Sequence, residues 1–194
     1  MRYDIIVSGV GGQGVISIGA IIAASAVRAG LHATQSEVHG MSQRGGAVVS
    51  HLRLSRQPIE SGTIGRGCAD LIIGMEPLEA LRHLEFLDPS GVILTNSRPV
   101  SNIAAYPDPQ DLIRSVENLP HALVVDATAL AREAGSARAA NVVMIGAAAT
   151  ILPTREDGIR SVIEEWFRPK GEKVVRINLD AFALGQEAVR CKAA

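Results

Sequence analysis

The sequence contains few of the residues from which proteins build metal centres. It has two cysteines, Cys68 and Cys191, among 194 residues, and no two of its five histidines are four positions apart. An iron–sulfur cluster requires about four cysteine ligands, and a zinc ribbon requires closely spaced cysteine pairs. We therefore expect this chain to make no metal site by itself.

Aromatic residues, basic runs and long hydrophobic runs are also scarce. Aromatics make up 3% of the sequence, and the formal net charge is −1. This composition argues against a nucleic-acid-binding surface. Since neither a signal peptide nor a run long enough to cross a membrane is present, we expect a soluble cytoplasmic protein. The 47% hydrophobic content can fill the core of one domain that spans residues 1–194.

Glycine, in contrast, is plentiful and is concentrated in the stretch G-V-G-G-Q-G, residues 9–14. The stretch follows an apolar run that predicts a strand (Tyr3–Ser8) and precedes an amphipathic helix that begins near Val15. In this context a G-x-G-x-x-G pattern allows a tight turn and lets the backbone approach an anion at the helix N-terminus. The candidate cofactor-binding residues are Gly9, Gly11, Gly12, Gln13 and Gly14.

The glycine stretch leaves three interpretations open. It could be a purely structural turn, a phosphate site, or the dinucleotide site of a Rossmann oxidoreductase. A dinucleotide site requires an acidic residue at the end of the second strand, about 20 residues further on. Glu37 is near that position, but the preceding run Leu31–Gln35 is only weakly apolar and predicts no clear strand.

The stretch from Ser36 to Gly46, S-E-V-H-G-M-S-Q-R-G-G, is polar and has no periodicity, so we predict a loop. Loops that a scaffold holds in place often carry function, although a surface loop without a function remains the alternative. The candidate residues are Glu37, His39, Met41, Gln43, Arg44, Gly45 and Gly46.

The remaining sequence alternates between strand and helix patterns. We expect a hairpin over Ala47–Ile64 and strands at Ala69–Met75, Val92–Thr95 and Ala122–Asp126. Helices are expected at Leu78–Leu87, Asp111–Leu119, Thr128–Ala134, Ala139–Leu152, from Thr154, and at Gly171–Lys192. This alternation predicts a three-layer α/β/α sandwich, Rossmann-like, with a mainly parallel sheet and a β-hairpin insertion.

Three further polar residues follow or precede these elements at places where ligands often bind. Glu76 and Asn96 come directly after two predicted buried strands, and Asn141 is near the start of an apolar helix. Open α/β sheets bind ligands at the carboxyl ends of their strands. The alternatives are a carboxylate that begins a helix for Glu76 and a capping or core-satisfied amide for Asn141.

Together, the stretches 9–14 and 36–46 resemble the gamma-type subunits of 2-oxoacid:ferredoxin oxidoreductases. The E-V-H-G-M-x-Q-R-G-G form is typical of the indolepyruvate members. The resemblance extends over nearly the whole chain, through weaker matches at Glu76–Ala80, Asn96–Pro99, Asn141–Met144 and Asn178–Phe182.

This resemblance implies oxidative decarboxylation of arylpyruvates, chiefly indolepyruvate, to aryl-acetyl-CoA, with ferredoxin as electron acceptor. Thiamine diphosphate, Mg and 4Fe-4S clusters would belong to a larger alpha subunit, and coenzyme A would be the co-substrate. This chain would cover the thiamine site and help to bind coenzyme A, and no catalytic residue is assigned to it. The partners would be the alpha subunit, ferredoxin through the complex and, for the isolated chain, a second copy.

The resemblance also implies roles for individual residues. Arg44 would be the charge partner of the coenzyme A pyrophosphate at the glycine stretch. Gln13 and Gln43 would supply hydrogen bonds, Glu37 and His39 would orient the loop, and Met41 would present an apolar surface. Two other functions stay open: an independent nucleotide-binding Rossmann oxidoreductase, and a non-catalytic assembly subunit.

Overall fold

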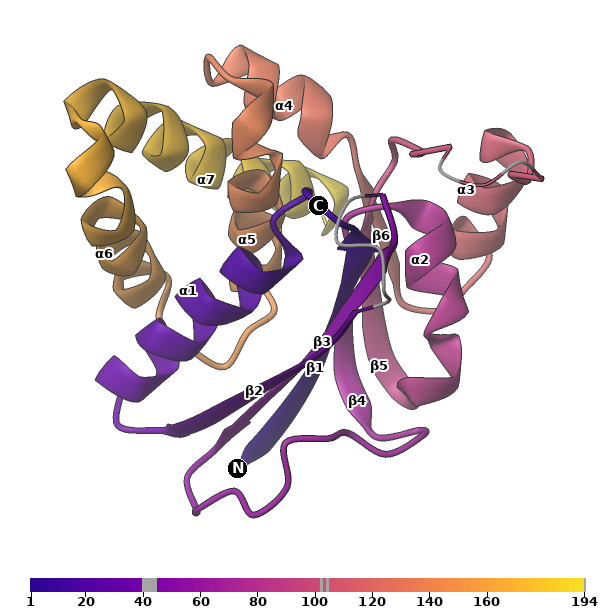
Figure 1. The fold of residues 1–194 in the computed structure, drawn as a ribbon, viewed down its shortest axis with the longest axis horizontal. Coiled ribbons are helices and arrows are strands. Elements are labelled where there is room, and N and C mark those ends of the chain that lie inside the picture. Colours follow the sequence, from indigo (N-terminus) through magenta and orange to yellow (C-terminus); the bar gives the residue numbers. More distant parts are fainter. Residues whose placement is uncertain (40–44, 102, 104, 194) are drawn as a thin grey trace.

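The computed structural model describes residues 1–39, 45–101, 103 and 105–193, and its centre is a six-stranded sheet (Figure 1). The strands lie in the order β2-β3-β1-β4-β5-β6. Parallel pairing joins β1 (Arg2–Val10), β4 (Ala69–Gly74), β5 (Leu87–Asn96) and β6 (Ala122–Val125). Antiparallel pairing joins β1 to β3 (Ala47–Ser55), and β3 to the edge strand β2 (His32–His39).

Helices cover both faces of this sheet, which confirms the three-layer α/β/α sandwich (Figure 1). One face carries α1 (Val15–Arg28), α4 (Ala127–Glu133), α5 (Ala140–Ala149), α6 (Glu156–Phe167) and α7 (Glu172–Ala193). The other carries α2 (Pro77–Arg82) and α3 (Pro109–Glu117). Short 3-10 turns, η1 (Leu84–Phe86), η2 (Ala137–Ala139) and η3 (Arg168–Lys170), connect them.

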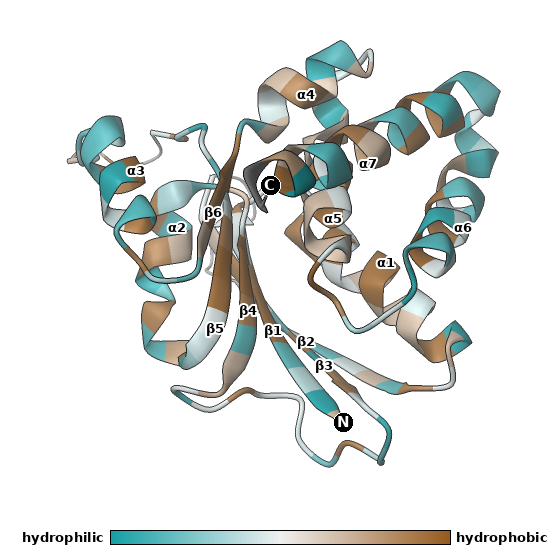
Figure 2. Cartoon of the chain, turned by 180° about the vertical axis from the view of Figure 1, so that it is seen from behind, coloured by the Kyte–Doolittle hydropathy of each residue, from teal (hydrophilic) through white to brown (hydrophobic). Residues whose placement is uncertain are grey.

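The side chains of the central strands point alternately to the two faces of the sheet, and both faces are apolar, so helices are needed on both sides. In β1, Ile5 and Val7 pack under α1 and α5, whereas Ile6 belongs to the smaller core on the opposite face. The neighbouring strands β4 and β5 divide their side chains in the same way. Successive residues of a strand point to opposite faces, so an apolar run buries both. Figure 2 shows hydrophobic residues along these strands, between the two helical layers.

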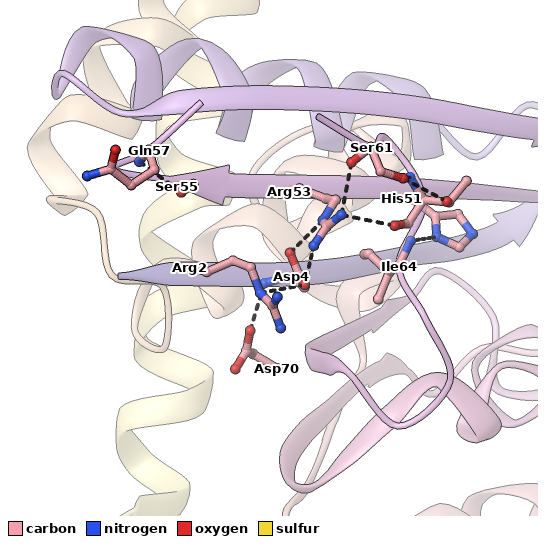
Figure 3. Close-up of polar contacts among 10 residues, drawn as sticks. Arg2, Asp4, His51, Arg53, Ser55, Gln57, Ser61, Ile64 and Asp70 are labelled. Atoms are coloured by element: carbon pink, nitrogen blue, oxygen red, sulfur yellow. Dashed lines mark hydrogen bonds and ion pairs between the residues drawn. The ribbon is translucent and has the colours of Figure 1, made fainter. Parts of the chain in front are cut away.

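The antiparallel part of the sheet differs from the prediction. The segment Ser36–His39, expected in a loop, continues β2, which pairs with β3 from His32–Ser55 to His39–Val48. The hairpin is therefore β2–β3, and the pairing expected for Ile59–Ile64 is wrong. The backbone of this segment is instead held to β3 by hydrogen bonds with the side chains of Arg53 and His51 (Figure 3). Backbone pairing with β3 stabilises β2 although its side chains are mostly polar.

Most helix predictions are confirmed to within three residues, but one is shorter than expected. The helix expected over Leu78–Leu87 ends at Arg82 and continues as η1. The next strand, β5, begins at Leu87 rather than Val92, with an irregular register where it pairs with β4. Among the described residues, we find no helix that combines the length and the apolar character of a membrane span.

Helices α5 and α7 cross at unusually close range. A Cβ atom on Gly146 would lie 2.1 Å from the Phe182 carbonyl oxygen, and one on Gly185 would lie 2.0 Å from the Val143 carbonyl oxygen. Each glycine thus accommodates the backbone of the opposite helix. Helix α7 packs over α5 and covers its outer side. This packing helps to bury α5 along almost its whole length.

Candidate functional site

The predicted glycine stretch forms a tight turn between β1 and α1 at the carboxyl edge of the sheet (Figure 1). Gly12 and Gly14 have φ angles of 101° and 83°, in the region that only glycine adopts readily. A Cβ atom on Gly9 would lie 2.8 Å from the Cβ of Met75. The stretch, which we call the glycine turn (residues 9–14), is therefore glycine-rich for steric reasons at several positions.

The side chain of Gln13 holds the glycine turn in place. Its Oε1 accepts a hydrogen bond from the Val10 N–H at 2.7 Å, and its Nε2 donates to the Met75 carbonyl oxygen at 3.2 Å. Gln13 was predicted to contact a ligand, and in this structure its amide joins the turn to the end of β4. The Gly11 N–H donates to the Gly46 carbonyl oxygen at 2.8 Å, so the turn also contacts the segment that enters β3.

The first turn of α1 presents unpaired backbone donors beside the glycine turn. Among the described residues, none supplies a side-chain cap to α1, and none accepts a hydrogen bond from the N–H groups of Val15, Ile16 or Ser17. The first turn of α1 also contains no acidic residue. Free N–H groups and the helix dipole favour an anion at such a place.

Asn96 and Glu76 both lie at the carboxyl edge of the sheet, but their side chains serve the scaffold. The Asn96 amide donates to the Met75 carbonyl oxygen at 3.2 Å and accepts from the Ala127 N–H at 3.0 Å. Glu76 is 1% exposed, and its carboxylate accepts hydrogen bonds from the Glu79 N–H and the Tyr106 hydroxyl. The structure thus favours the helix-start alternative for Glu76.

The second carboxylate of this region has an unusual environment. Glu79 is 2% exposed, its Oε2 accepts no hydrogen bond from the described residues, and Arg82 lies 3.4 Å from its Oε1. Burial raises the pKa of Glu79, and its neighbour Glu76 raises it further, against the opposing effect of Arg82. Burial and the hydrogen bond to Glu76 likewise raise the pKa of the Tyr106 hydroxyl. Glu76 and Glu79 belong to the N-terminal end of α2, so this cluster lies on the opposite face of the sheet from α1.

Asn141, in contrast, lies directly against the glycine turn. A Cβ atom on Gly14 would lie 2.7 Å from its Nδ2, so the start of α5 and the turn are in close contact. The structure therefore brings this predicted residue together with Gly12, Gln13 and Gly14 around one cavity.

Glu37 lies on a strand, although the sequence predicted no clear strand before it. Its position in the sheet differs from that of the acidic residue of a dinucleotide site. It is on β2, where its carboxylate accepts a hydrogen bond from Gln35, whose amide also donates to the Ile16 carbonyl oxygen. In the usual Rossmann order the second strand is parallel to the first and adjacent to it. Here the antiparallel β3 lies between β1 and β2, so the geometry of a ribose-binding acid is not reproduced.

The remaining predicted loop residues are only partly described. Gly45 has a φ angle of 77°, and Gly46 bonds to Gly11 as described above. His39 ends β2, and nothing is described of its side chain. Met41, Gln43 and Arg44 lie outside the described residues, so their roles remain predictions.

Two cavities adjoin the glycine turn. The turn pocket, of about 550 Å³, lies toward β3 and is lined by Val10, Gly11, Gly12, Gly14, Val15, Ile16, Ser17 and Val48. The second cavity, of about 560 Å³, shares Gly12, Gly14 and Ser17 and extends toward α5, α6 and α7. We call it the α5–α7 cleft.

The polar and aromatic residues of the α5–α7 cleft that were not among the candidates from sequence include Arg138, Trp166, Lys170 and Asn178. They come from η2, α6, η3 and α7, far from the glycine turn in sequence. Their spacing along the sequence therefore gave no sign that they line one cleft with the turn. The only available signals were that Trp166 is the single tryptophan and that Asn178 belongs to a stretch that resembled the family.

Metal ligands are not gathered in the described part of the chain. No group of three or more histidine, cysteine, aspartate or glutamate side chains lies close enough there to hold an ion. Both cysteines are exposed and unpaired.

Several known proteins are similar to this chain, and they point to one family. The sequence profile described as "Pyruvate ferredoxin/flavodoxin oxidoreductase" matches residues 4–188. The indolepyruvate oxidoreductase subunits IorB of Thermococcus kodakarensis and Archaeoglobus fulgidus are 35% and 36% identical, over 97% and 95% of this chain. These matches cover 96% and 94% of the two relatives. The ketoisovalerate oxidoreductase subunit VorA of Methanothermobacter thermautotrophicus is 28% identical, over 95% of this chain and 36% of its own length.

Solved structures share the fold. The gamma subunit of a keto/oxoacid ferredoxin oxidoreductase from Geobacter sulfurreducens has a TM-score of 0.73 and 25% identity, over 97% of this chain and 99% of its own. The 2-oxoglutarate:ferredoxin oxidoreductase of Magnetococcus marinus has a TM-score of 0.77 and 23% identity, over 98% of this chain and 31% of its own. By sequence and by fold, the chain belongs to the pyruvate ferredoxin/flavodoxin oxidoreductase family, as a gamma-type subunit of a 2-oxoacid:ferredoxin oxidoreductase.

Proposed function

We propose that this chain is the smaller subunit of an oxidoreductase for arylpyruvates, chiefly indolepyruvate. The reaction would release carbon dioxide, join the remaining acyl group to coenzyme A and pass two electrons to ferredoxin. The observation that carries the proposal is the identity of 35% to the Thermococcus kodakarensis indolepyruvate oxidoreductase subunit, over 97% of this chain and 96% of that one.

The cysteine content does not suit an iron–sulfur cluster held by this chain alone. A 4Fe-4S cluster takes four cysteine thiolates, and the sequence has two cysteines, both of them exposed. We place thiamine diphosphate, Mg and the iron–sulfur clusters on the larger alpha subunit, through which ferredoxin would also be contacted. The contribution of this chain is then to bind and orient coenzyme A and to cover the thiamine site.

The glycine turn fits one part of the reaction, the binding of coenzyme A. The unpaired N–H groups of α1 and the turn pocket beside them suit a pyrophosphate. Arg44 precedes Gly45, which lies next to the backbone bond between Gly11 and Gly46. We propose that Arg44 adds a charge-assisted bond to this anion, and that Met41 and Gln43 in the same stretch face the larger subunit.

Reconstitution with the larger subunit tests the proposed function. The two chains should be co-expressed anaerobically, and ferredoxin reduction should be followed with indolepyruvate, pyruvate, 2-oxoglutarate or 2-oxoisovalerate as the substrate. We expect turnover that requires both chains and coenzyme A and that is fastest with indolepyruvate. Full activity of the larger subunit alone, or a preference for pyruvate, would contradict the proposal.

The variant Arg44→Ala tests the coenzyme A contact. Loss of a charge-assisted hydrogen bond, worth about 1.5–3 kcal/mol, should lower coenzyme A affinity or turnover about tenfold to hundredfold. The stability of the free chain should change by less than about 0.5 kcal/mol, as for most surface substitutions. Arg44→Lys should restore only part of the affinity, because lysine lacks the planar fork. A large fall in Tm with unchanged kinetic constants would instead make Arg44 a structural residue.

A further inference from the structure

The α5–α7 cleft lies on the opposite side of the glycine turn from the turn pocket, and the proposed function gives it no role. Its walls are the turn and the start of α1, the junction of η2 with α5, the end of α6 with η3, and the first turns of α7. Figure 1 shows these helices arranged around one region above the sheet. A volume of about 560 Å³ lies within the range of small-molecule sites.

The charge of the cleft has one sign. Arg138 and Lys170 line it, and none of the described residues that line it is acidic. Lys170 has its ammonium 5.1 Å from the centre of the Phe167 ring, a cation–π contact that fixes it at the wall. No acidic side chain in the described part of the chain forms an ion pair with Arg138 or Lys170. Two cations without an ion-pair partner among the described residues favour an anion in the cleft.

A largely buried amide lies in the wall of the cleft and adds polar groups to it. Asn178 lines the cleft and is only 5% exposed. Its Nδ2 donates to the Val174 carbonyl oxygen at 2.8 Å, whereas its Oδ1 accepts no hydrogen bond from the described residues. This oxygen is not one of the fully buried side-chain atoms without a partner among the described residues, so it is open to solvent at the cleft wall, where a ligand can donate to it. Asn141, Ser17 and Ser136 add further donors and acceptors.

The remaining wall is aromatic and aliphatic. Trp166 is 43% exposed, which is unusual for the only tryptophan of a chain, and it lines the cleft with Phe167, Val174 and Ile177. An exposed indole next to cations is suited to stacking on a heteroaromatic base. A cleft with cations, polar donors and an aromatic wall therefore matches a ligand that has a phosphate at one end and a base at the other.

We propose that the α5–α7 cleft binds a purine nucleotide. Its phosphate lies between Arg138, Lys170 and the glycine turn, and its base lies against Trp166. The nucleotide has two possible sources: the adenosine 3′,5′-bisphosphate end of coenzyme A, or a free adenine nucleotide. In the first case the inference rests on the proposed function, and in the second it stands apart from it.

Because Trp166 is the only tryptophan, its fluorescence reports on this cleft in the full chain. The chain should be titrated with adenosine 3′,5′-bisphosphate, AMP, coenzyme A and pantetheine, with calorimetry in parallel. We expect saturable binding and a change in Trp166 emission with adenosine 3′,5′-bisphosphate, and none with pantetheine. Equal competition by coenzyme A identifies its nucleotide end as the source, whereas binding of AMP with exclusion of coenzyme A identifies a free nucleotide.

Paired charge variants test the residues. Arg138→Gln combined with Lys170→Gln should weaken nucleotide binding at least about tenfold, the loss expected for a charge-assisted bond. Arg160→Gln with Lys173→Gln removes the same charge from α6 and α7 outside the cleft and should change affinity less than about threefold. Equal effects of the two double variants, or no binding by either method at millimolar nucleotide, would overturn the inference.

The same proteins separate this inference from the proposed function. If the reconstituted complex has no arylpyruvate activity but the chain still binds nucleotide through Arg138 and Lys170, only the proposed function fails. If the complex is active and the cleft variants leave both nucleotide binding and the KM for coenzyme A unchanged, only the inference fails.

Discussion

Arg53 shows how one side chain can hold three segments of this chain together. Its Nε and Nη2 donate to the buried carboxylate of Asp4 at 3.0 and 3.2 Å (Figure 3). Its Nη1 donates to the carbonyl oxygens of Ser61 and Thr63 at 2.9 and 3.1 Å. It thereby connects β1, β3 and the segment that follows β3.

We expect Arg53→Ala to be strongly destabilising, since it leaves the fully buried Asp4 with the exposed Arg2 as its one cationic partner among the described residues. Removal of one partner of a buried pair costs about 3–5 kcal/mol in free energy of unfolding. Urea unfolding measures this change. In the control Arg28→Ala, which breaks an exposed pair with Glu165, the loss should stay below about 1 kcal/mol. Similar losses for both variants would show that Arg53 is no more than a surface contact.

His51 should make stability depend on pH. Its Nδ1 accepts a hydrogen bond from the Ile64 N–H at 3.1 Å, and the residue is 8% exposed. Burial, and then the charge of Arg53, lower the pKa of His51 in the folded chain below its ordinary value of 6.5. The unfolded chain therefore binds the proton first, and stability present above pH 6.5 is lost as the pH falls toward the folded pKa. Burial lowers the pKa of His83 too, with the same sign.

The free energy of unfolding should thus be smaller at pH 5.5 than at pH 7.5, and the difference should shrink in His51→Asn. Asparagine keeps an oxygen acceptor near the Nδ1 position without titrating. His121→Asn, at an exposed histidine, is the matched control and should keep the wild-type difference. An unchanged pH dependence in His51→Asn would count against this interpretation.

Among the elements, the crossing of α5 and α7 should tolerate the least change. A methyl group at Gly146 or Gly185 would overlap the backbone of the opposite helix, at 2.1 or 2.0 Å. Overpacking a core typically costs about 1–3 kcal/mol, and backbone cannot move aside as a side chain can. We therefore expect Gly146→Ala and Gly185→Ala each to lose at least this much in urea unfolding.

The control for this crossing is Gly65→Ala, whose new Cβ would meet only the Cys68 Sγ at an ordinary 3.6 Å. It should change stability by less than about 0.5 kcal/mol. If both helix variants matched the control, the two helices would have to be further apart than described here.

The elements that sequence predicted well are those with strong apolar patterns. The buried strands β1, β4 and β6 and the helices α1 and α5 were recognised because their side chains face the core. The edge strand β2 was missed, since Thr34, Gln35 and Ser36 carry no pattern and its stability comes from backbone pairing with β3. The apolar residues Ile59 and Ile64 suggested a strand, but Arg53 and His51 hold that segment by its backbone instead.

The candidate site was predictable only where it is local in sequence. The glycine turn followed from its pattern. Asn141 was a candidate from its position near the start of an apolar helix, and its contact with the turn comes from tertiary packing. The cations and the indole of the α5–α7 cleft come from three separate elements that tertiary packing alone brings together. The ligand-binding roles predicted for Gln13 and Asn96 did not anticipate the Met75 carbonyl oxygen, which both side chains contact.

For the whole molecule, we expect the isolated chain to be colourless and free of iron and thiamine diphosphate, and the complex with the larger subunit to contain both. The reason is the donor set, since two cysteines cannot provide the four ligands of a cluster. Iron, acid-labile sulfide and thiamine assays on anaerobically purified samples measure this. A stoichiometric cluster in the isolated chain would contradict the assignment of all redox groups to the partner.

The position of α7 over α5 also matters for how the chain is made. All six strands and the apolar α5 leave the ribosome before α7, so the nascent chain exposes a helix with eight buried residues until its cover arrives. Exposed apolar surface of this kind binds chaperones and promotes aggregation. A chain that ends before Glu172 should therefore aggregate more readily than the full chain, because the face of α5 that α7 covers stays exposed.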